Sequence, residues 1–124
     1  MKFVILIYGN PQSREVWASL PANQRDEGIE AYERLTDDLM ASGEFIVGEP
    51  LADPSLGRRV PATQHLPGTT DGPFAEAKEH LAGFILVDCE SFERALEHAA
   101  RVPEAAFGLV EVRPVMDMSA FSDL

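Results

Sequence analysis

The stretch 81-LAGFILVD-88 decides the fold, because it is apolar on both sides of an extended chain. Side chains of a strand point alternately to opposite faces of a sheet, and neither alternating set within residues 81–87 contains a polar residue. The stretch 3-FVILIY-8 repeats this pattern, with only the tyrosine hydroxyl as a polar group. A sheet with one face in water would alternate apolar and polar residues. We therefore expect both faces of this sheet to be covered.

Two amphipathic segments are predicted to be the main helices. The first covers residues 24–42, with Asn23 as its N-cap and Gly43 as the residue that ends it. Its apolar residues recur at helical spacing, and charged residues occupy the other face. The second covers residues 92–101 and follows Ser91 as its N-cap.

The remaining elements complete a ferredoxin-like pattern. Further strands are predicted at residues 44–48 and 108–115. Residues 58–62 are a weaker candidate, because a proline restricts any strand there to an edge. Residues 15–20 are expected to form one helical turn. The order β-α-β-β-α-β predicts a single α+β domain over residues 1–124, an antiparallel sheet with two main helices on one face.

The face of this sheet that the helices leave bare predicts a homodimer. Right-handed crossovers place both helices on the same face, so the other face needs a different cover. Burying ~500 Å² on each of two subunits contributes on the order of 25 kcal/mol, which exceeds an association cost of roughly 4–15 kcal/mol. A symmetric homodimer that packs sheet against sheet is therefore expected. The alternative is that residues 49–57 or residues 116–124 fold over this face.

Charge and composition exclude several classes of partner. A formal net charge of −11 argues against binding to nucleic acid or to an anionic membrane. No apolar run approaches the roughly 20 residues of a membrane-spanning helix. The only cysteine, Cys89, cannot form an internal disulfide, which is typical of a reducing compartment and predicts a cytoplasmic protein.

We expect neither a cofactor nor a metal ion. The chain has no Rossmann or P-loop glycine pattern. Glu76 and His80 have i, i+4 spacing, but two ligands do not make a site, and His98 has no partner at ligand spacing. Glu90 follows Cys89 and disfavours a thiolate, so a nucleophilic cysteine is not expected either.

The segment 71-DGPFAEAKEH-80 holds most of the candidate site residues. Asp71 either caps the turn that Gly-Pro builds or projects into the cleft between sheet and long helix as a general base. Glu79 is either solvated or lies beside Asp71, where two close carboxylates would split their pKa values and supply an acid. Phe74 and Lys78 are candidate substrate-binding residues, although Lys78 is equally compatible with a surface ion pair.

Two further candidates lie outside that segment. Tyr32 belongs to the apolar stripe of the long helix, either as a core aromatic residue with its hydroxyl at the rim or as a catalytic proton donor at the mouth of the pocket. Arg113 either forms an ion pair at the dimer interface or receives a substrate carboxylate with its planar guanidinium.

These motifs together resemble the YCII-related family, in its DGPF-domain branch. The resemblance covers nearly the whole chain and is carried by Asp71-Gly72-Pro73-Phe74, Glu76, Lys78-Glu79, Gly83-Phe84, Glu111-Val112-Arg113-Pro114-Val115, Leu6-Ile7-Tyr8-Gly9, Ala95-Leu96-Glu97 and Arg101-Val102-Pro103. It implies a ferredoxin-like fold of the dimeric α/β barrel class.

The resemblance implies less about chemistry. Most of the family is uncharacterised, although one related member is a dehydrochlorinase acting on a hydroxylated aromatic ring. In another branch a His-Asp pair is the proposed active site, and Tyr32 stands at the position of that histidine, so this chain departs from the pattern. One hypothesis is therefore a small-molecule-binding protein or a cofactor-independent acid/base enzyme. The other is a non-catalytic accessory dimer that acts through a protein partner, since relatives are often encoded beside alternative sigma factors.

Overall fold

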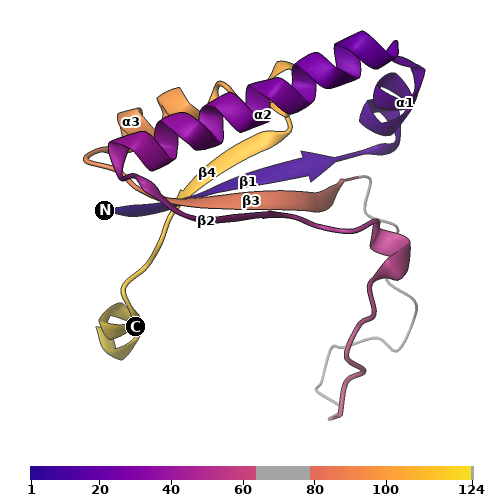
Figure 1. Cartoon of the computed structure of the whole chain (residues 1–124). Coiled ribbons are helices and arrows are strands. Elements are labelled where there is room, and N and C mark those ends of the chain that lie inside the picture. Colours follow the sequence, from indigo (N-terminus) through magenta and orange to yellow (C-terminus); the bar gives the residue numbers. More distant parts are fainter. Residues whose placement is uncertain (64–78, 124) are drawn as a thin grey trace.

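The chain folds into a sheet with helices on one face. The computed structural model describes residues 1–63 and 79–123, and the statements below concern these residues. Strands pair antiparallel in the order β2-β3-β1-β4, with bounds β1 Lys2–Gly9, β2 Phe45–Pro50, β3 His80–Asp88 and β4 Val110–Pro114. Helices α2 (Ala22–Ser42) and α3 (Phe92–Ala99) cover the same face of the sheet (Figure 1). The predicted ferredoxin-like α+β fold is confirmed.

The core lies between the sheet and these two helices. Antiparallel register places Phe3 opposite Val87 and Ile5 opposite Ile85, so the two central strands send the same alternating set toward the helices. Leu35 and Leu39 of α2 are fully buried against that set. The helix-facing half of the alternation therefore forms the hydrophobic core, as the apolar pattern indicates.

The first connection contains a complete helix rather than the single turn predicted over residues 15–20. Helix α1 covers Pro11–Ser19, and Asn10 caps it: the Ser13 amide donates to Asn10 Oδ1 at 2.7 Å, while the Asn10 amide donates to Ser13 Oγ at 3.0 Å. The reciprocal pair satisfies two amides at the helix start, and Pro11 fits the first helical position.

The start of the long helix also differs from the prediction. Helix α2 begins at Ala22 after Pro21, so Asn23 lies inside the helix and is not its N-cap. The fixed φ of proline, here −58°, supplies the entry geometry instead of a side-chain cap. At the other end the prediction holds, because Gly43 adopts φ 77° and its amide bonds back to the last turn.

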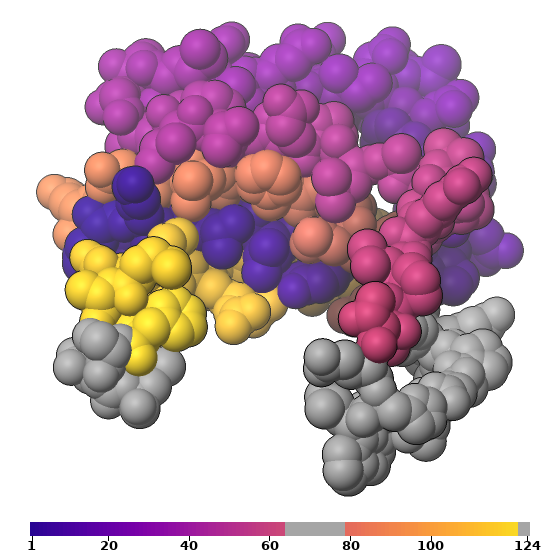
Figure 2. Space-filling model, turned by 90° about the horizontal axis from the view of Figure 1, so that it is seen from below, coloured from indigo at the N-terminus to yellow at the C-terminus, as the bar shows by residue number. Residues whose placement is uncertain are grey.

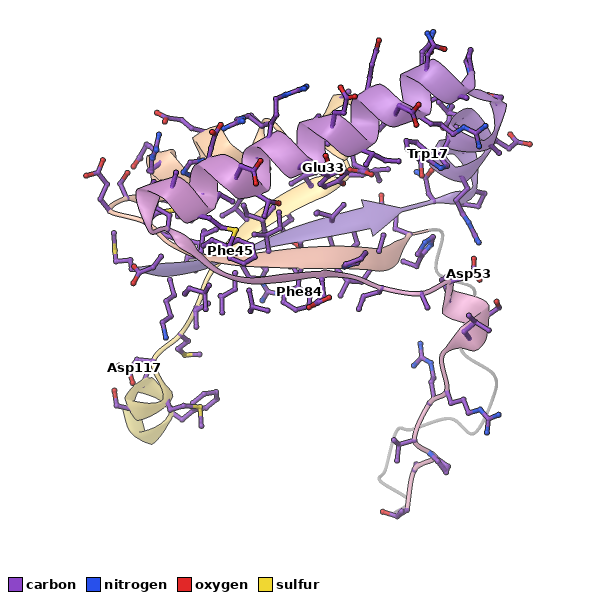
Figure 3. The ribbon with its side chains drawn as sticks, viewed as in Figure 1. Trp17, Glu33, Phe45, Asp53, Phe84 and Asp117 are labelled. Carbon is purple, nitrogen blue, oxygen red and sulfur yellow. The ribbon has the colours of Figure 1, made fainter. Side chains whose placement is uncertain are left out.

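A glycine inside α2 has a packing reason. A Cβ on Gly28 would lie 3.2 Å from the ring of Trp17, so the missing side chain lets α1 pack closely on α2. An ion pair between Arg14 of α1 and Asp53, labelled in Figure 3 beyond the end of β2, ties α1 to the segment that follows the strand.

Residues 58–62 do not form the predicted edge strand. The Leu51 amide donates to Ala82 O at 2.8 Å and ends the pairing of β2 with β3. A short 3₁₀ turn, Pro54–Leu56, then begins with the Asp53 side chain accepting from the Ser55 amide at 2.9 Å. This turn directs the chain away from the sheet edge, so residues 58–62 do not pair with any of the four described strands.

The sheet face opposite the helices carries the second apolar set. Val4, Leu6, Phe84 and Leu86 are half-buried there. The segment after β2 and the tail after β4 project on this side at opposite ends, and in Figure 1 neither crosses the middle of the face. Viewed from below, atoms of β1 and β3 are visible between them (Figure 2). The described parts of these two segments therefore do not form the roof that was the alternative to a dimer.

Candidate functional site

A cavity of about 450 Å³ lies between α2 and the β2–β3 half of the sheet. Its lining is mostly apolar and comes from Ile7, Ile29, Tyr32, Glu33, Thr36, Phe45, Gly48, Glu49, Pro50, Ala82, Gly83, Phe84, Ile85 and Glu104. The volume lies within the range typical of small-molecule sites. The labelled Phe45 lies between sheet and helix, whereas the ring of Phe84 points to the opposite side of the sheet (Figure 3).

Two glycines form part of the floor of this cavity. A Cβ on Gly83 would lie 3.1 Å from the carbonyl oxygen of Glu49, and one on Gly48 would lie 3.3 Å from the carbonyl oxygen of Phe84. An irregularity between Phe45 and Val47 shifts the register of β2, so that Phe45 and Gly48 oppose residues of the helix-facing set of β3. The absence of side chains leaves room between the strands and α2.

A hydroxyl and a carboxylate meet in this mostly apolar space. The Tyr32 hydroxyl, from the middle of α2, donates to Glu104 Oε2, from the short helix Pro103–Phe107 that precedes β4. Burial raises the pKa of Tyr32 far above its usual value, and the hydrogen bond to Glu104 raises it further. Tyr32 is therefore a neutral hydrogen-bond donor at physiological pH, and the Glu104 carboxylate is its acceptor.

The structure brings one of the predicted site residues to this cavity. Tyr32 lines it, and its catalytic role stays a prediction. Glu79 is exposed just before β3, and Arg113 is exposed on β4, opposite Val4 and so on the sheet face away from the helices. Asp71, Phe74 and Lys78 lie outside the described residues. Their roles stay predictions.

Sequence reasoning missed Glu104. It lies 72 residues from Tyr32, and it belongs to a short helix that no local pattern identified. The available signal was Pro103, which ends the preceding helical region and is a favoured first residue of a new turn.

The fold is therefore that of a ferredoxin-like α+β protein with a cavity between its sheet and its long helix. The chain belongs to the YCII-related domain family, which matches residues 1–119.

Two similar proteins extend this assignment. The uncharacterised protein R00369 of Rhizobium meliloti (strain 1021) is 34% identical over 125 residues, covering 93% of this chain and 92% of that protein. Among solved structures, 5-chloro-2-hydroxyhydroquinone dehydrochlorinase (TftG) from Burkholderia phenoliruptrix AC1100, in complex with 2,5-dihydroxybenzoquinone, superposes with a TM-score of 0.53 and 20% identity over 97% of this chain and 98% of that chain. This likeness shows the shared fold.

Proposed function

We propose that this protein binds a small hydroxylated ring in the cavity beneath α2 and is an acid/base enzyme without a cofactor. The observation that carries the proposal is the Tyr32–Glu104 pair inside a mostly apolar cavity of about 450 Å³. Apolar walls with a few converging polar groups are the usual form of a small-molecule site.

The pair suggests how the site would act. Glu104 accepts the Tyr32 hydrogen at Oε2, which fixes the carboxylate and leaves Oε1 as the oxygen that a ligand hydroxyl would meet. Glu104 is then the general base, and Tyr32 is the residue that positions it. A planar ring would fill the space between the sheet and Ile29 of α2. The dehydrochlorinase with the similar fold acts on a ring of this kind, which agrees with the proposal.

The residues predicted in the DGPF segment are proposed to form a second part of the same site. Asp71 is the proposed second acid/base residue, with Phe74 and Lys78 as ring and oxygen contacts. Glu79, which directly follows Lys78 in the sequence and precedes β3, is proposed to assist. Because Arg113 lies on the face away from the cavity, its proposed role moves from substrate binding to the contact between subunits.

We also propose that the protein is a homodimer through the open sheet face. That face has an apolar centre, formed by β1 and β3, and charged residues at its edges, including Glu49, Glu111 and Arg113. An apolar centre with a polar rim is the usual anatomy of an interface. The projecting segments add exposed apolar side chains on the same side, such as Val60 and Met118. These would contact the second subunit.

Thermal-shift measurements with 2,5-dihydroxybenzoquinone, hydroquinone and benzoic acids test the ligand site. Wild-type protein should be stabilised by about 2.7 kcal/mol when a ligand is present at 100 times its Kd. The stabilisation should disappear in Glu104→Gln and weaken in Tyr32→Phe. Tyr8→Phe and Glu111→Gln are matched controls, because these two residues form the same kind of pair on the open face at 2.9 Å.

The outcomes separate the two functional hypotheses. Loss of binding in Asp71→Asn as well would bring the DGPF turn into the same site. Binding that survives Glu104→Gln would refute the assignment of Glu104. If no compound of the set binds wild-type protein, the accessory dimer becomes the better hypothesis.

A further inference from the structure

A second cluster of reactive side chains lies at the other end of the α2–sheet interface. Glu44 precedes β2, Cys89 follows β3, and His98 belongs to α3. The carboxylate oxygen, the thiol sulfur and the imidazole nitrogen of these residues all lie within 4.8 Å of one another. Cys89 and His98 are buried, and the Glu44 side chain is 14% exposed. The fold therefore brings three different types of metal ligand close together.

The carboxylate at the centre of this cluster is fixed from several sides. His98 Nε2 lies 2.9 Å from Glu44 Oε1, and Ser42 Oγ donates to the same oxygen at 2.7 Å. Arg94 donates to both oxygens, from Nε to Oε2 at 3.2 Å and from Nη2 to Oε1 at 3.1 Å. Burial would raise the pKa of Glu44, but these hydrogen bonds, with one from Cys89, outweigh it and lower the pKa to about 2. The carboxylate is ionised at neutral pH.

We propose that Glu44, Cys89 and His98 form a binding site for a thiophilic divalent cation such as Zn²⁺, with Arg94 as the resident competitor for the carboxylate. Thiolate, imidazole and carboxylate are the three ligand types that Zn²⁺ uses in proteins. Bond lengths of about 2.0–2.3 Å in a tetrahedral site place ligand atoms roughly 3.3–3.8 Å apart. Separations near the upper limit of 4.8 Å would have to shorten by about 1 Å, and the 2.9 Å between His98 Nε2 and Glu44 Oε1 would have to widen by about 0.4 Å. The fourth position would hold water.

A surface hollow adjoins this cluster at Glu44. It has a volume of about 460 Å³ and is lined by Glu44, Ser91, Arg94 and three further glutamates, Glu90, Glu93 and Glu97. Four carboxylates against one guanidinium give the hollow a negative potential, which concentrates cations. Such carboxylates alone would not make a site. The buried sulfur and nitrogen ligands behind them provide it.

Arg94 also has a second ion-pair partner besides Glu44. Arg94 Nη1 already donates to Glu97 Oε2 at 3.2 Å, on the outer side of α3. When the cation binds, Glu44 exchanges its hydrogen bonds from Arg94 for a metal–oxygen bond, and the guanidinium remains paired with Glu97. The Cys89 thiol forms the metal–sulfur bond and releases its proton to water. His98 binds as the neutral ring, with its one proton on the ring nitrogen that does not hold the metal, so the hydrogen bond from His98 to Glu44 is given up.

Titration with Co²⁺ tests the site, because a thiolate bound to Co²⁺ gives a sulfur-to-metal charge-transfer band that no oxygen or nitrogen ligand produces. Wild-type protein should show this band, and Zn²⁺ should abolish it by displacement. Arg94→Gln should raise the affinity for Co²⁺ about tenfold or more, because a charge-assisted hydrogen-bonded competitor is removed. Arg101→Gln is the matched control: Arg101 pairs with Asp38 at 2.7 Å on the surface, and its loss should leave the affinity unchanged.

Cys89→Ser should abolish the band and His98→Ala should weaken binding, with circular dichroism confirming that each variant is folded. If both variants fail to fold, the wild-type protein and Arg94→Gln still decide the question. The absence of a charge-transfer band from both of these at saturating Co²⁺ would overturn the proposal. Lower affinity in Arg94→Gln would also overturn the role of Arg94 as competitor, because it would show that the cluster needs the guanidinium.

Discussion

The two faces of the sheet carry the same pair of side chains in different surroundings. On the helix-covered face Tyr32 donates to Glu104, and on the open face Tyr8 donates to Glu111 at 2.9 Å. Burial is the main cause of the raised pKa of Tyr32, whereas the hydrogen bond to Glu111 is the main cause for Tyr8. The same two residue types therefore have different properties on the two faces. Burial beneath α2 is what distinguishes the covered pair from the exposed one.

The apolar sets on the two faces differ in the same way. The helix-facing set is closed over by Leu35 and Leu39, and it forms the core. The other set has charged neighbours at the sheet edges and no described element across its centre. The proposed roles follow from this contrast, with a ligand site on one side and a subunit contact on the other.

The largest expected effect comes from a charge on the open face. Leu6→Glu places a carboxylate at the centre of the proposed interface in both subunits, and burying such unpaired ions costs on the order of 5 kcal/mol per dimer. Sedimentation equilibrium should show a dimer for wild-type protein and a monomer for this variant. Met40→Glu, at an exposed position of α2, should remain dimeric. A monomeric wild type would refute the dimer, and a dimeric Leu6→Glu would move the interface elsewhere.

A pair of leucine truncations compares the two faces directly. Leu35→Ala creates a cavity in the core and should lower the free energy of unfolding by about 2–5 kcal/mol at any protein concentration. Leu6→Ala should lower the free energy of unfolding by a smaller amount at low protein concentration, where monomers prevail. The loss should grow as the protein concentration rises and dimers form. Urea unfolding at several concentrations measures both. Equal, concentration-independent losses would show that the two faces are equivalent parts of one core.

Local sequence patterns predicted the covered face better than the site within it. The alternation in residues 81–87 and the stripe that includes Leu35 and Leu39 specify strand, helix and core, because burial acts on every second or every third to fourth residue. Proximity of distant residues leaves no such periodic trace. Glu104 reaches Tyr32 across 72 residues, and the Glu44–Cys89–His98 cluster joins three separate elements.

Errors at element ends have local physical causes. Asn23 is a good N-cap residue, but Pro21 already sets the helical entry, so α2 begins one residue before Asn23. The expected strand at residues 58–62 does not pair with the described strands, because the 3₁₀ turn Pro54–Leu56 directs the chain away from the edge of the sheet.

A smaller effect should follow from filling the floor of the cavity. Gly83→Ala places a Cβ 3.1 Å from a backbone oxygen of β2, which cannot move freely, so overpacking should cost about 1–3 kcal/mol. Ligands of the cavity should bind more weakly as well. Gly43→Ala is not a suitable control, because its positive φ adds backbone strain. Ala82→Gly serves as the control, because it changes the neighbouring position of the same strand without adding volume. Unchanged stability and binding in Gly83→Ala would show that the floor is not tightly packed.

The smallest effects concern the two tyrosines, and their alkaline titration separates the faces. The raised pKa of Tyr32 means that the folded protein keeps the phenol proton while the unfolded chain loses it near pH 10. Above that pH the unfolded state binds fewer protons, so the contribution of Tyr32 to stability is complete below pH 10 and declines as pH rises. Tyr32→Phe should remove this decline and cost about 1.5 kcal/mol at neutral pH through the lost charge-assisted hydrogen bond.

The chain has only two tyrosines, so ultraviolet absorbance assigns each ionisation. In Tyr32→Phe the remaining Tyr8 should ionise reversibly at a pKa moderately above the usual value, held there by Glu111. In Tyr8→Phe the remaining Tyr32 should not ionise until the protein unfolds, and the two events should coincide in absorbance and circular dichroism. Ionisation of Tyr32 in the folded state would mean that water reaches the pair. The covered face would then resemble the open one, and the enclosure on which the proposed chemistry depends would be lost.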